Sequence, residues 1–524
     1  MEPSLVKEID TATDRIDTAA YRRRTLRFLL LICAFKIFLA FYLELGNDEA
    51  YYWLYSQHLQ WNYFDHPPMV ALWIRIFTAN LSLDAGGFIR LGSVVGSALS
   101  AWFLYRAVAL VHSERAGWLA AVLYHSSFYA GITAGLYILP DSPQMVFWTG
   151  AMWLMALVER EPDRWRHWLL FGLVSGLCIM SKVHGVFLWA GMGGYAIFYQ
   201  RGWLRRPQIY VAALVTLVLI SPIIFWNIHY DFITYKFHSS RVTVRHFAIL
   251  WKSFLREAAS QLGFNNPVNV VLIVTALAAW WRRRRPFPPV FPLYGFTGLP
   301  LALVLLCISL FRDTTLPHWS GPAYVSLLPF AAVALAQKSK SAWPVFLRWS
   351  FALFLIVLAG WTVIVKAFPG TWGSKLGEDY GRGDISLDMY GWEHASEQFG
   401  IFYRQQEAEG KAPAGLPLVA THWWGAHVDY YFARPLGQPL IGLGQPRLLN
   451  HYLWTNRLHR DRLKSGEAYC IIPSDDHTRL PYEYFDSARR VAVIPIERSG
   501  SPAHYFFVYR LSGLKKPAPE IEEK

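Results

Sequence analysis

Long apolar stretches separated by short polar connections dominate the chain up to residue 366. A helix needs about 20 residues to cross an apolar layer about 30 Å thick, and stretches near that length predict membrane-spanning helices. They cover residues 26–44, 86–111, 116–136, 142–158, 167–181, 184–199, 208–226, 267–281, 289–311, 320–337 and 345–366. The pattern predicts a polytopic α-helical membrane protein with about 11 to 13 transmembrane helices.

Short basic stretches between the apolar segments predict the orientation of the chain. Threading from a cytoplasmic N-terminus brings them to one side, at residues 22–24, 106–115, 160–166, 201–206, 282–285 and 338–340. The positive-inside rule makes that side cytoplasmic. The chain then divides into a cytoplasmic tail (1–25), a transmembrane domain (26–366) with outer loops 44–85 and 227–266, and an outer domain (367–524).

The composition changes after residue 366. A charged stretch near 390–410 is typical of a helix, and short β-prone runs lie at 416–424, 469–473, 490–496 and 505–511. About 150 residues are enough for one small extracytoplasmic α/β domain. Of the four cysteines only Cys470 lies there, so we expect neither a disulfide framework nor a zinc site.

Overall composition excludes several classes of protein. With 54% hydrophobic residues the chain is too apolar for a single water-soluble core. Much of the net charge of +13 sits in the short cytoplasmic loops, so we expect no nucleic-acid partner. No Gly-rich phosphate loop occurs, which argues against nucleotide-driven transport and against a sugar-nucleotide domain. We therefore expect an activated substrate that is delivered within the membrane.

Two adjacent carboxylates, Asp48 and Glu49, follow the first apolar segment in the run Asn-Asp-Glu-Ala-Tyr-Tyr-Trp at 47–53. Ionisable residues at a membrane edge are costly and indicate chemistry. The same residues could instead cap a short interfacial helix, since Asn and Asp are favoured at that position. Both interpretations stay open on the sequence alone.

This run, together with Tyr-Phe-Asp-His-Pro-Pro at 63–68, resembles the first outer loop of membrane glycosyltransferases of the GT-C type. The resemblance is closest to bacterial family 39-like enzymes, which are similar to dolichyl-phosphate-mannose protein mannosyltransferases and are related to the lipid A aminoarabinose and galacturonic acid transferases. Further matching motifs lie at 89–91, 139–143 and 316–319, so the similarity covers roughly residues 40 to 340.

The resemblance implies transfer of a single sugar from a polyprenyl-phosphate carrier to an acceptor hydroxyl of a lipid, polysaccharide or protein, with inversion. The reaction would take place on the outer face of a bacterial inner membrane. Asp48 holds the position of the general base, which typically contributes about 10²- to 10⁴-fold to the rate. Glu49 would support it, and Asp141 is a third candidate carboxylate.

A lipid phosphate is the leaving group in this reaction, and its developing charge needs cations or helix N-termini nearby. The candidate donor-binding residues are His66, Arg90, Lys182, His238, Arg241, Arg245 and His318. The aminoarabinose transferases carry Lys where this chain has His66, and a histidine is charged at neutral pH only if its neighbours raise its pKa. As alternatives, Arg90 and Lys182 could be interfacial snorkellers, Asp141 a helix cap, and the histidines packing residues.

We expect no metal or other cofactor, although Asp48, Glu49, Asp65 and Asp141 could meet around a divalent cation. Two other functions remain as alternatives. One is a transporter or flippase of lipid-linked glycans, and the other a ligase or polymerase that uses a lipid-diphosphate-linked oligosaccharide. The chain shows no internal repeat and keeps its unusual charges at one mouth of the bundle, which favours the transferase.

Overall fold

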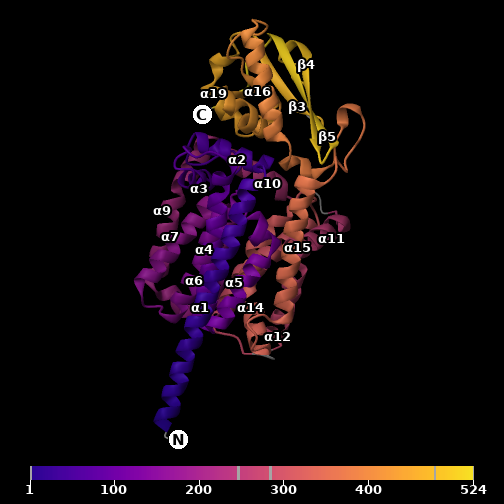
Figure 1. Cartoon of the computed structure of the whole chain (residues 1–524). Coiled ribbons are helices and arrows are strands. Elements are labelled where there is room, and N and C mark those ends of the chain that lie inside the picture. The colour runs from indigo at the N-terminus through magenta and orange to yellow at the C-terminus, as the bar shows by residue number, and fades with distance from the viewer. Residues whose placement is uncertain (1–2, 245–247, 283–285, 477–479, 523–524) are drawn as a thin grey trace. The chain divides into compact units, whose positions relative to one another are not determined.

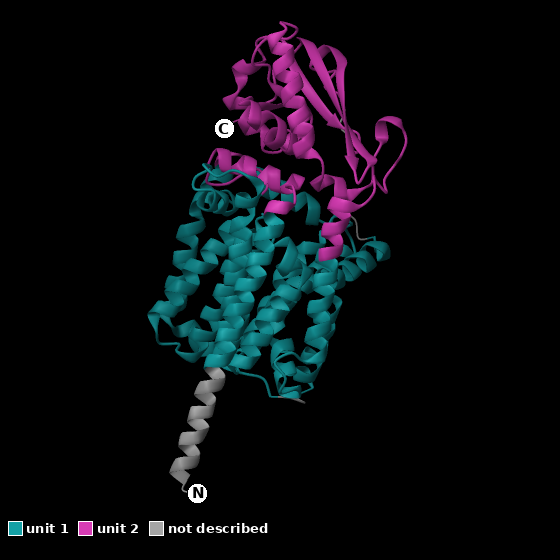
Figure 2. Cartoon of the chain, viewed as in Figure 1, with its two compact units in different colours: residues 1–40, 66–228, 232–358 teal, residues 41–65, 229–231, 359–524 magenta. Residues whose placement is uncertain are grey.

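The computed structural model describes the backbone of residues 3–244, 248–282, 286–476 and 480–522. The chain forms two compact units that alternate along the sequence (Figure 2). Unit 1 comprises residues 1–40, 66–228 and 232–358, and unit 2 comprises residues 41–65, 229–231 and 359–524.

Helices make up unit 1, and several of its long helices run side by side (Figure 1). All eleven apolar segments expected from the sequence are wholly or largely helical. They form α1 (Pro3–Tyr42), α4 (Gly86–Val111), α5 (Glu114–Ser126), α6 (Asp141–Arg160), α7 (Trp165–Ser181), α8 (Val186–Phe198), α9 (Pro207–His229), α12 (Pro267–Trp281), α13 (Phe291–Ser309), α14 (Gly321–Lys338) and α15 (Val345–Ala367). The connections add α3 (Met69–Phe77), α10 (Ile233–Val242) and α11 (Trp251–Phe264).

Six helices in the described part of the chain are long and apolar enough to cross a membrane. They are the segment Ala19–Tyr42 of α1, then α4, α9, α13, α14 with the turn before it, and α15. A seventh span results if α11 and α12, which meet at a bend of 100°, count as one. Many apolar helices are thus confirmed, while the number of 11 to 13 crossings stays a prediction.

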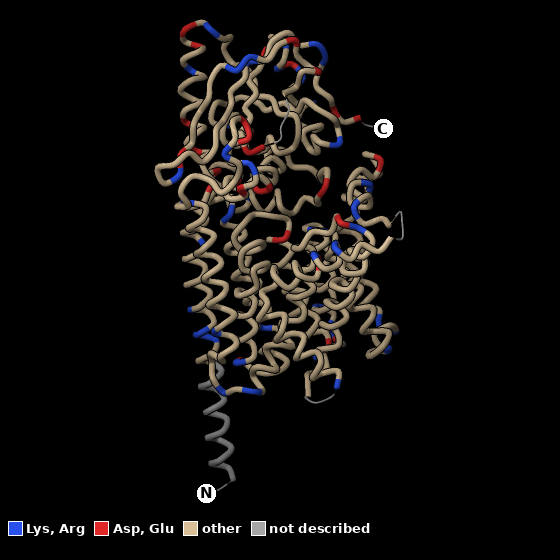
Figure 3. Tube along the Cα trace, turned by 90° about the vertical axis from the view of Figure 1, so that its right-hand side faces the viewer, with Lys and Arg blue, Asp and Glu red and all other residues tan. Residues whose placement is uncertain are grey.

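Small residues allow the helices of unit 1 to approach closely. A methyl group added at Gly191 of α8 would lie 2.2 Å from the hydroxyl oxygen of Thr297 in α13, and one at Gly172 of α7 would lie 2.2 Å from the carbonyl oxygen of Ala212 in α9. Such contacts are typical of helices that pack without a hydrophobic driving force between them. Most of the bundle trace is uncharged, and Lys and Arg occur at its lower end as well as at other places along it (Figure 3).

Unit 2 contains a five-stranded mixed sheet in the order β2-β1-β3-β5-β4. The strands are β1 (Leu418–Ala420), β2 (Leu440–Gly442), β3 (Glu467–Pro473), β4 (Phe485–Arg498) and β5 (Ser501–Leu514). β1 runs parallel to β2 and β3, whereas β3, β5 and β4 are antiparallel. The unit's helices are α2 (Asn47–Gln57), α16 (Trp392–Ala408), α17 (Ala426–Val428), α18 (Pro446–Leu449) and α19 (Tyr452–Leu458). The α/β character expected after residue 366 is confirmed; β2 was not expected.

The segment 41–65 is built into unit 2 by specific bonds. The Glu44 carboxylate, 8% exposed, accepts hydrogen bonds from the backbone N–H groups of Gly391 (3.1 Å), which precedes α16, and of Trp392 (2.7 Å) and Glu393 (3.4 Å), which begin it. These N–H groups have no partner within their own helix, and an anion is favoured there. The expected outer loop 44–85 is therefore divided, with unit 2 ending at Asp65 and unit 1 resuming at His66.

Candidate functional site

The acidic pair lies in the first turn of α2, within unit 2. Glu49 is 3% exposed, and its carboxylate accepts a hydrogen bond of 2.9 Å from the backbone N–H of Gly46, the residue that precedes the helix. Glu49 therefore caps α2, as the alternative interpretation of the motif suggested. Asp48 is exposed on the same turn. The structure thus separates a helix-capping carboxylate from an accessible one.

A third carboxylate, Asp388, comes next to this pair from the short helix Ile385–Met389. Its two oxygens each lie 3.3 Å from the backbone nitrogen of Asn47, which donates to them. About half of its side chain is exposed (49%), yet the surrounding protein and then the Asp48 carboxylate raise the pKa of Asp388 to about 7. The sequence analysis missed Asp388, because no local motif links it to a segment 341 residues away.

His427 adds a neutral donor beside these carboxylates. Its Nε2 lies 2.9 Å from the carbonyl oxygen of Leu45, to which it donates, and its Nδ1 lies 3.9 Å from an oxygen of Asp388. Burial lowers the pKa of His427 to about 4. The histidine is therefore uncharged at neutral pH and does not neutralise the carboxylates.

In unit 1, Asp141 and Lys182 form a buried ion pair with an N–O distance of 2.7 Å. Asp141 begins α6, Lys182 follows α7, and the side chains are 3% and 4% exposed. The Tyr129 hydroxyl also donates to Asp141 over 2.8 Å. Neither the cap interpretation of Asp141 nor the snorkelling interpretation of Lys182 fits, because both side chains are turned into the protein and engaged with each other.

Four half-buried histidines gather around this ion pair. His66 interacts electrostatically with His238, Lys182, His318 and His184, and His318 interacts with Lys182, Asp141 and Arg241. The rings of His66 and His238 are 5.6 Å apart. We call the set the polar cluster; it consists of His66, Lys182, His184, His238, Arg241 and His318. Five of its members were candidates from the sequence, and His184 was missed although it stands two residues after Lys182.

His66 lies in a connection outside the membrane-spanning helices, and burial together with its cationic neighbours lowers its pKa well below the ordinary value. His66 is therefore neutral at pH 7, and it does not replace the fixed charge of the lysine found in the aminoarabinose transferases. In this chain Lys182 and Arg241 carry the charge of the cluster instead.

The other two basic candidates lie differently. Arg90 is fully buried, donates to the carbonyl oxygen of Ala40 over 3.4 Å and stacks 5.4 Å from the ring centre of Tyr137. A snorkelling role does not fit such burial. Arg245 lies outside the described residues. Among the residues that the structure describes, no group of three or more His, Cys, Asp or Glu could hold a metal ion, and metal dependence stays untested.

Comparisons with known proteins give a consistent set of similarities. A family model described as dolichyl-phosphate-mannose-protein mannosyltransferase matches residues 65–226. The lipid A galacturonosyltransferase RgtD of Rhizobium johnstonii is 24% identical over 394 residues, which are 71% of this chain and 80% of RgtD. The undecaprenyl phosphate-alpha-4-amino-4-deoxy-L-arabinose arabinosyl transferase of Pseudomonas aeruginosa is 28% identical over 331 residues, and the match spans 58% of this chain and 55% of that enzyme.

The fold is shared with a solved structure. The crystal structure of ArnT from Cupriavidus metallidurans bound to undecaprenyl phosphate has a TM-score of 0.57 and 15% identity, covering 93% of this chain and 98% of ArnT. The family model and the relatives confirm the resemblance inferred from the motifs.

Proposed function

We propose that this chain, a membrane glycosyltransferase of the GT-C type, moves a single sugar from a polyprenyl-phosphate carrier to an acceptor on the outer face of a bacterial inner membrane. The named relatives act on lipid A, or use an undecaprenyl-phosphate-linked aminoarabinose. An undecaprenyl-phosphate sugar as donor and a lipid A-like glycolipid as acceptor follow from that kinship.

The observation that carries the proposal is the polar cluster of unit 1. Ionisable side chains in an apolar helical bundle are costly and mark a functional site by default. Donors directed at a phosphate stabilise the negative charge that develops as the sugar leaves. The Asp141 carboxylate fixes the Lys182 ammonium in place, and the half-buried histidines and Arg241 offer further donors. This is the set of groups that a polyprenyl-phosphate leaving group requires.

We assign the general base to Asp48. It is exposed at the first turn of α2, where Glu49 accepts the capping hydrogen bond from Gly46. Asp388 beside it is partly protonated at neutral pH, so the two groups need not both be charged, and Asp48 can take the acceptor's proton. A direct displacement with this base inverts the anomeric configuration, because the acceptor attacks the face opposite the phosphate.

Asp48→Asn tests the assignment. We expect transfer from a purified polyprenyl-phosphate sugar to fall by about 10²- to 10⁴-fold, since the amide cannot accept a proton. Membrane insertion should not change and the unfolding temperature should not fall, because the side chain is exposed and its charge repels Asp388. Asp379→Asn, at another exposed carboxylate of unit 2, is the matched control and should leave transfer intact. Full activity of Asp48→Asn would remove Asp48 from the mechanism.

A further inference from the structure

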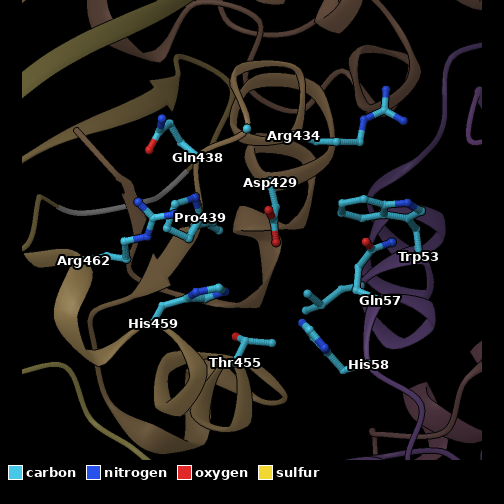
Figure 4. A pocket seen from close by; sticks show the side chains of 13 residues that line it. Trp53, Gln57, His58, Asp429, Arg434, Gln438, Pro439, Thr455, His459 and Arg462 are labelled. Atoms are coloured by element: carbon cyan, nitrogen blue, oxygen red, sulfur yellow. The ribbon is translucent and has the colours of Figure 1, made fainter. Parts of the chain in front are cut away.

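A second polar site lies entirely within unit 2. It is a pocket with a volume of about 230 Å³, and none of the residues proposed so far for catalysis line it. The last turns of α2 supply Trp53, Gln57 and His58, and the C-terminal part of the unit supplies residues between Asp429 and Arg462. In Figure 4 the Asp429 carboxylate lies near the centre, with His459 and Arg462 to one side and α2 to the other. We call it the unit 2 pocket.

Positive charge gathers in the unit 2 pocket. Arg434, Arg462, His58 and His459 all line it. Burial, followed by the nearby His58 and Arg462, lowers the pKa of His459. The lowered pKa leaves His459 uncharged at pH 7, so Arg434 and Arg462 supply the positive charge that an anion in the pocket meets.

The arginine at the inner wall is held in a defined place. The guanidinium of Arg434 lies 4.0 Å from the ring centre of Tyr430 and 5.9 Å from that of Trp53. Stacking of this kind orders an arginine and keeps its N–H groups directed at a partner. A surface arginine without such support has many positions, so the pocket contains one ordered cation and a second, more exposed one at Arg462.

The pocket also offers groups that suit a sugar. Burial raises the pKa of Asp429 to about 7, and Tyr452 donates to its carboxylate over 3.1 Å. Asp429 can therefore donate as well as accept at neutral pH. Gln57 and Thr455 also line the pocket, and their amide and hydroxyl groups can exchange hydrogen bonds with the hydroxyls of a sugar.

The size of the pocket limits the ligand. Pockets for drug-sized molecules have volumes of about 300 to 1,000 Å³, and this one is smaller. It suits one monosaccharide with a charged substituent, and neither an oligosaccharide nor an acyl chain. From the cations, the aromatic wall and this volume, we propose that the unit 2 pocket binds an anionic monosaccharide, a sugar that bears a phosphate or a carboxylate. The inference rests on the proposed function, since either substrate of the transferase can carry such a headgroup.

Direct binding to the full-length protein tests the pocket. The probes are N-acetylglucosamine 1-phosphate and galacturonate, with neutral N-acetylglucosamine for comparison. We expect both charged sugars to bind at least about tenfold more tightly than the neutral one, and Arg462→Gln or His459→Gln to weaken them about tenfold. Arg447→Gln, at an exposed arginine of the same unit outside the pocket, is the matched control. Equal binding of charged and neutral sugars, or equal effects of Arg462→Gln and Arg447→Gln, would overturn the proposal.

Transfer assays with Arg462→Gln then identify the source of the headgroup. A higher KM for the acceptor alone assigns the pocket to the acceptor, and a higher KM for the donor alone assigns it to the donor's sugar. Unchanged KM values for both would contradict a role in the reaction. Binding of the charged sugars is also measured in Asp48→Asn. If this variant lacks transferase activity but still binds them, the pocket is established independently of the reaction. Failure of the proposed function can then be told apart from failure of this inference.

Discussion

Asp388 lies in an environment that the sequence around it does not indicate. Three carboxylates interact with it electrostatically, Asp48 and Glu49 from α2 and Asp475 from the turn after β3, and the nearby His427 is neutral. Like charges and partial burial both penalise its ionised form. The folded protein therefore holds the Asp388 proton to a higher pH than the unfolded chain does.

This arrangement predicts a pH dependence of stability. Since the folded-state pKa is raised, the contribution of Asp388 is fully present below its ordinary pKa and is lost as pH rises through about 7. Asp388→Asn should therefore gain stability over the wild type at pH 8 but not at pH 4. Solvent screening limits the gain to about 1 kcal/mol, or about 2 to 4 °C in the unfolding midpoint. Thermal unfolding at both pH values checks this, and an equal difference at both would contradict it.

The residues of the site show what sequence can and cannot reveal. Asp48, Asp141 and His318 stand in local motifs, so their chemistry was visible in the sequence. Asp388 and His427 reach the acidic pair from more than 300 residues away, and no local pattern records a contact at that separation. The neutral state of His66 was also beyond the sequence, because it depends on neighbours from three other segments.

At the scale of elements, the helices were predictable because a bilayer leaves the backbone no other partner for its N–H and C=O groups. Apolar length then gives the boundaries, and α4 ends where the apolar run ends. The segment 116–136 was expected to be one helix, but α5 ends at Ser126 and a wider helical turn, Tyr129–Thr133, follows it. β2 was missed because three residues carry too little pattern to be recognised.

Two glycines of α8 test how closely its neighbour packs. Gly191→Ala places a methyl group 2.2 Å from the Thr297 hydroxyl and 2.9 Å from its Cα, so α8 and α13 have to separate. Overpacking of this kind costs about 1 to 3 kcal/mol. Gly193→Ala meets nothing within 4 Å and gains about 1 kcal/mol of helix propensity. We expect a lower unfolding temperature in detergent for the first variant only; equal midpoints would refute the close contact.

At the scale of the whole molecule, the sequence predicts which face of the membrane each part of the chain occupies. We expect the C-terminal part of the chain to face outward and the short basic loops to face the cytoplasm. In a chain whose four cysteines are replaced, Arg447→Cys should react with a membrane-impermeant maleimide on intact cells. Gly202→Cys, which has open space around it, should react only after permeabilisation. The reverse pattern would invert the topology and exclude an outer active site.

Unit 2 is formed by segments that precede and follow the membrane helices in the sequence, and this restricts the number of times the chain can cross the membrane. Its parts are separated in sequence by most of the membrane helices, yet Glu44 bonds directly to residues 391 to 393, so both parts must emerge on the same side. The chain between α1 and the end of α15 therefore crosses the bilayer an even number of times, and the total including α1 is odd. Totals of 7, 11 or 13 satisfy this parity, whereas a total of six crossings violates it, so the six long apolar helices cannot by themselves be the complete set of spans.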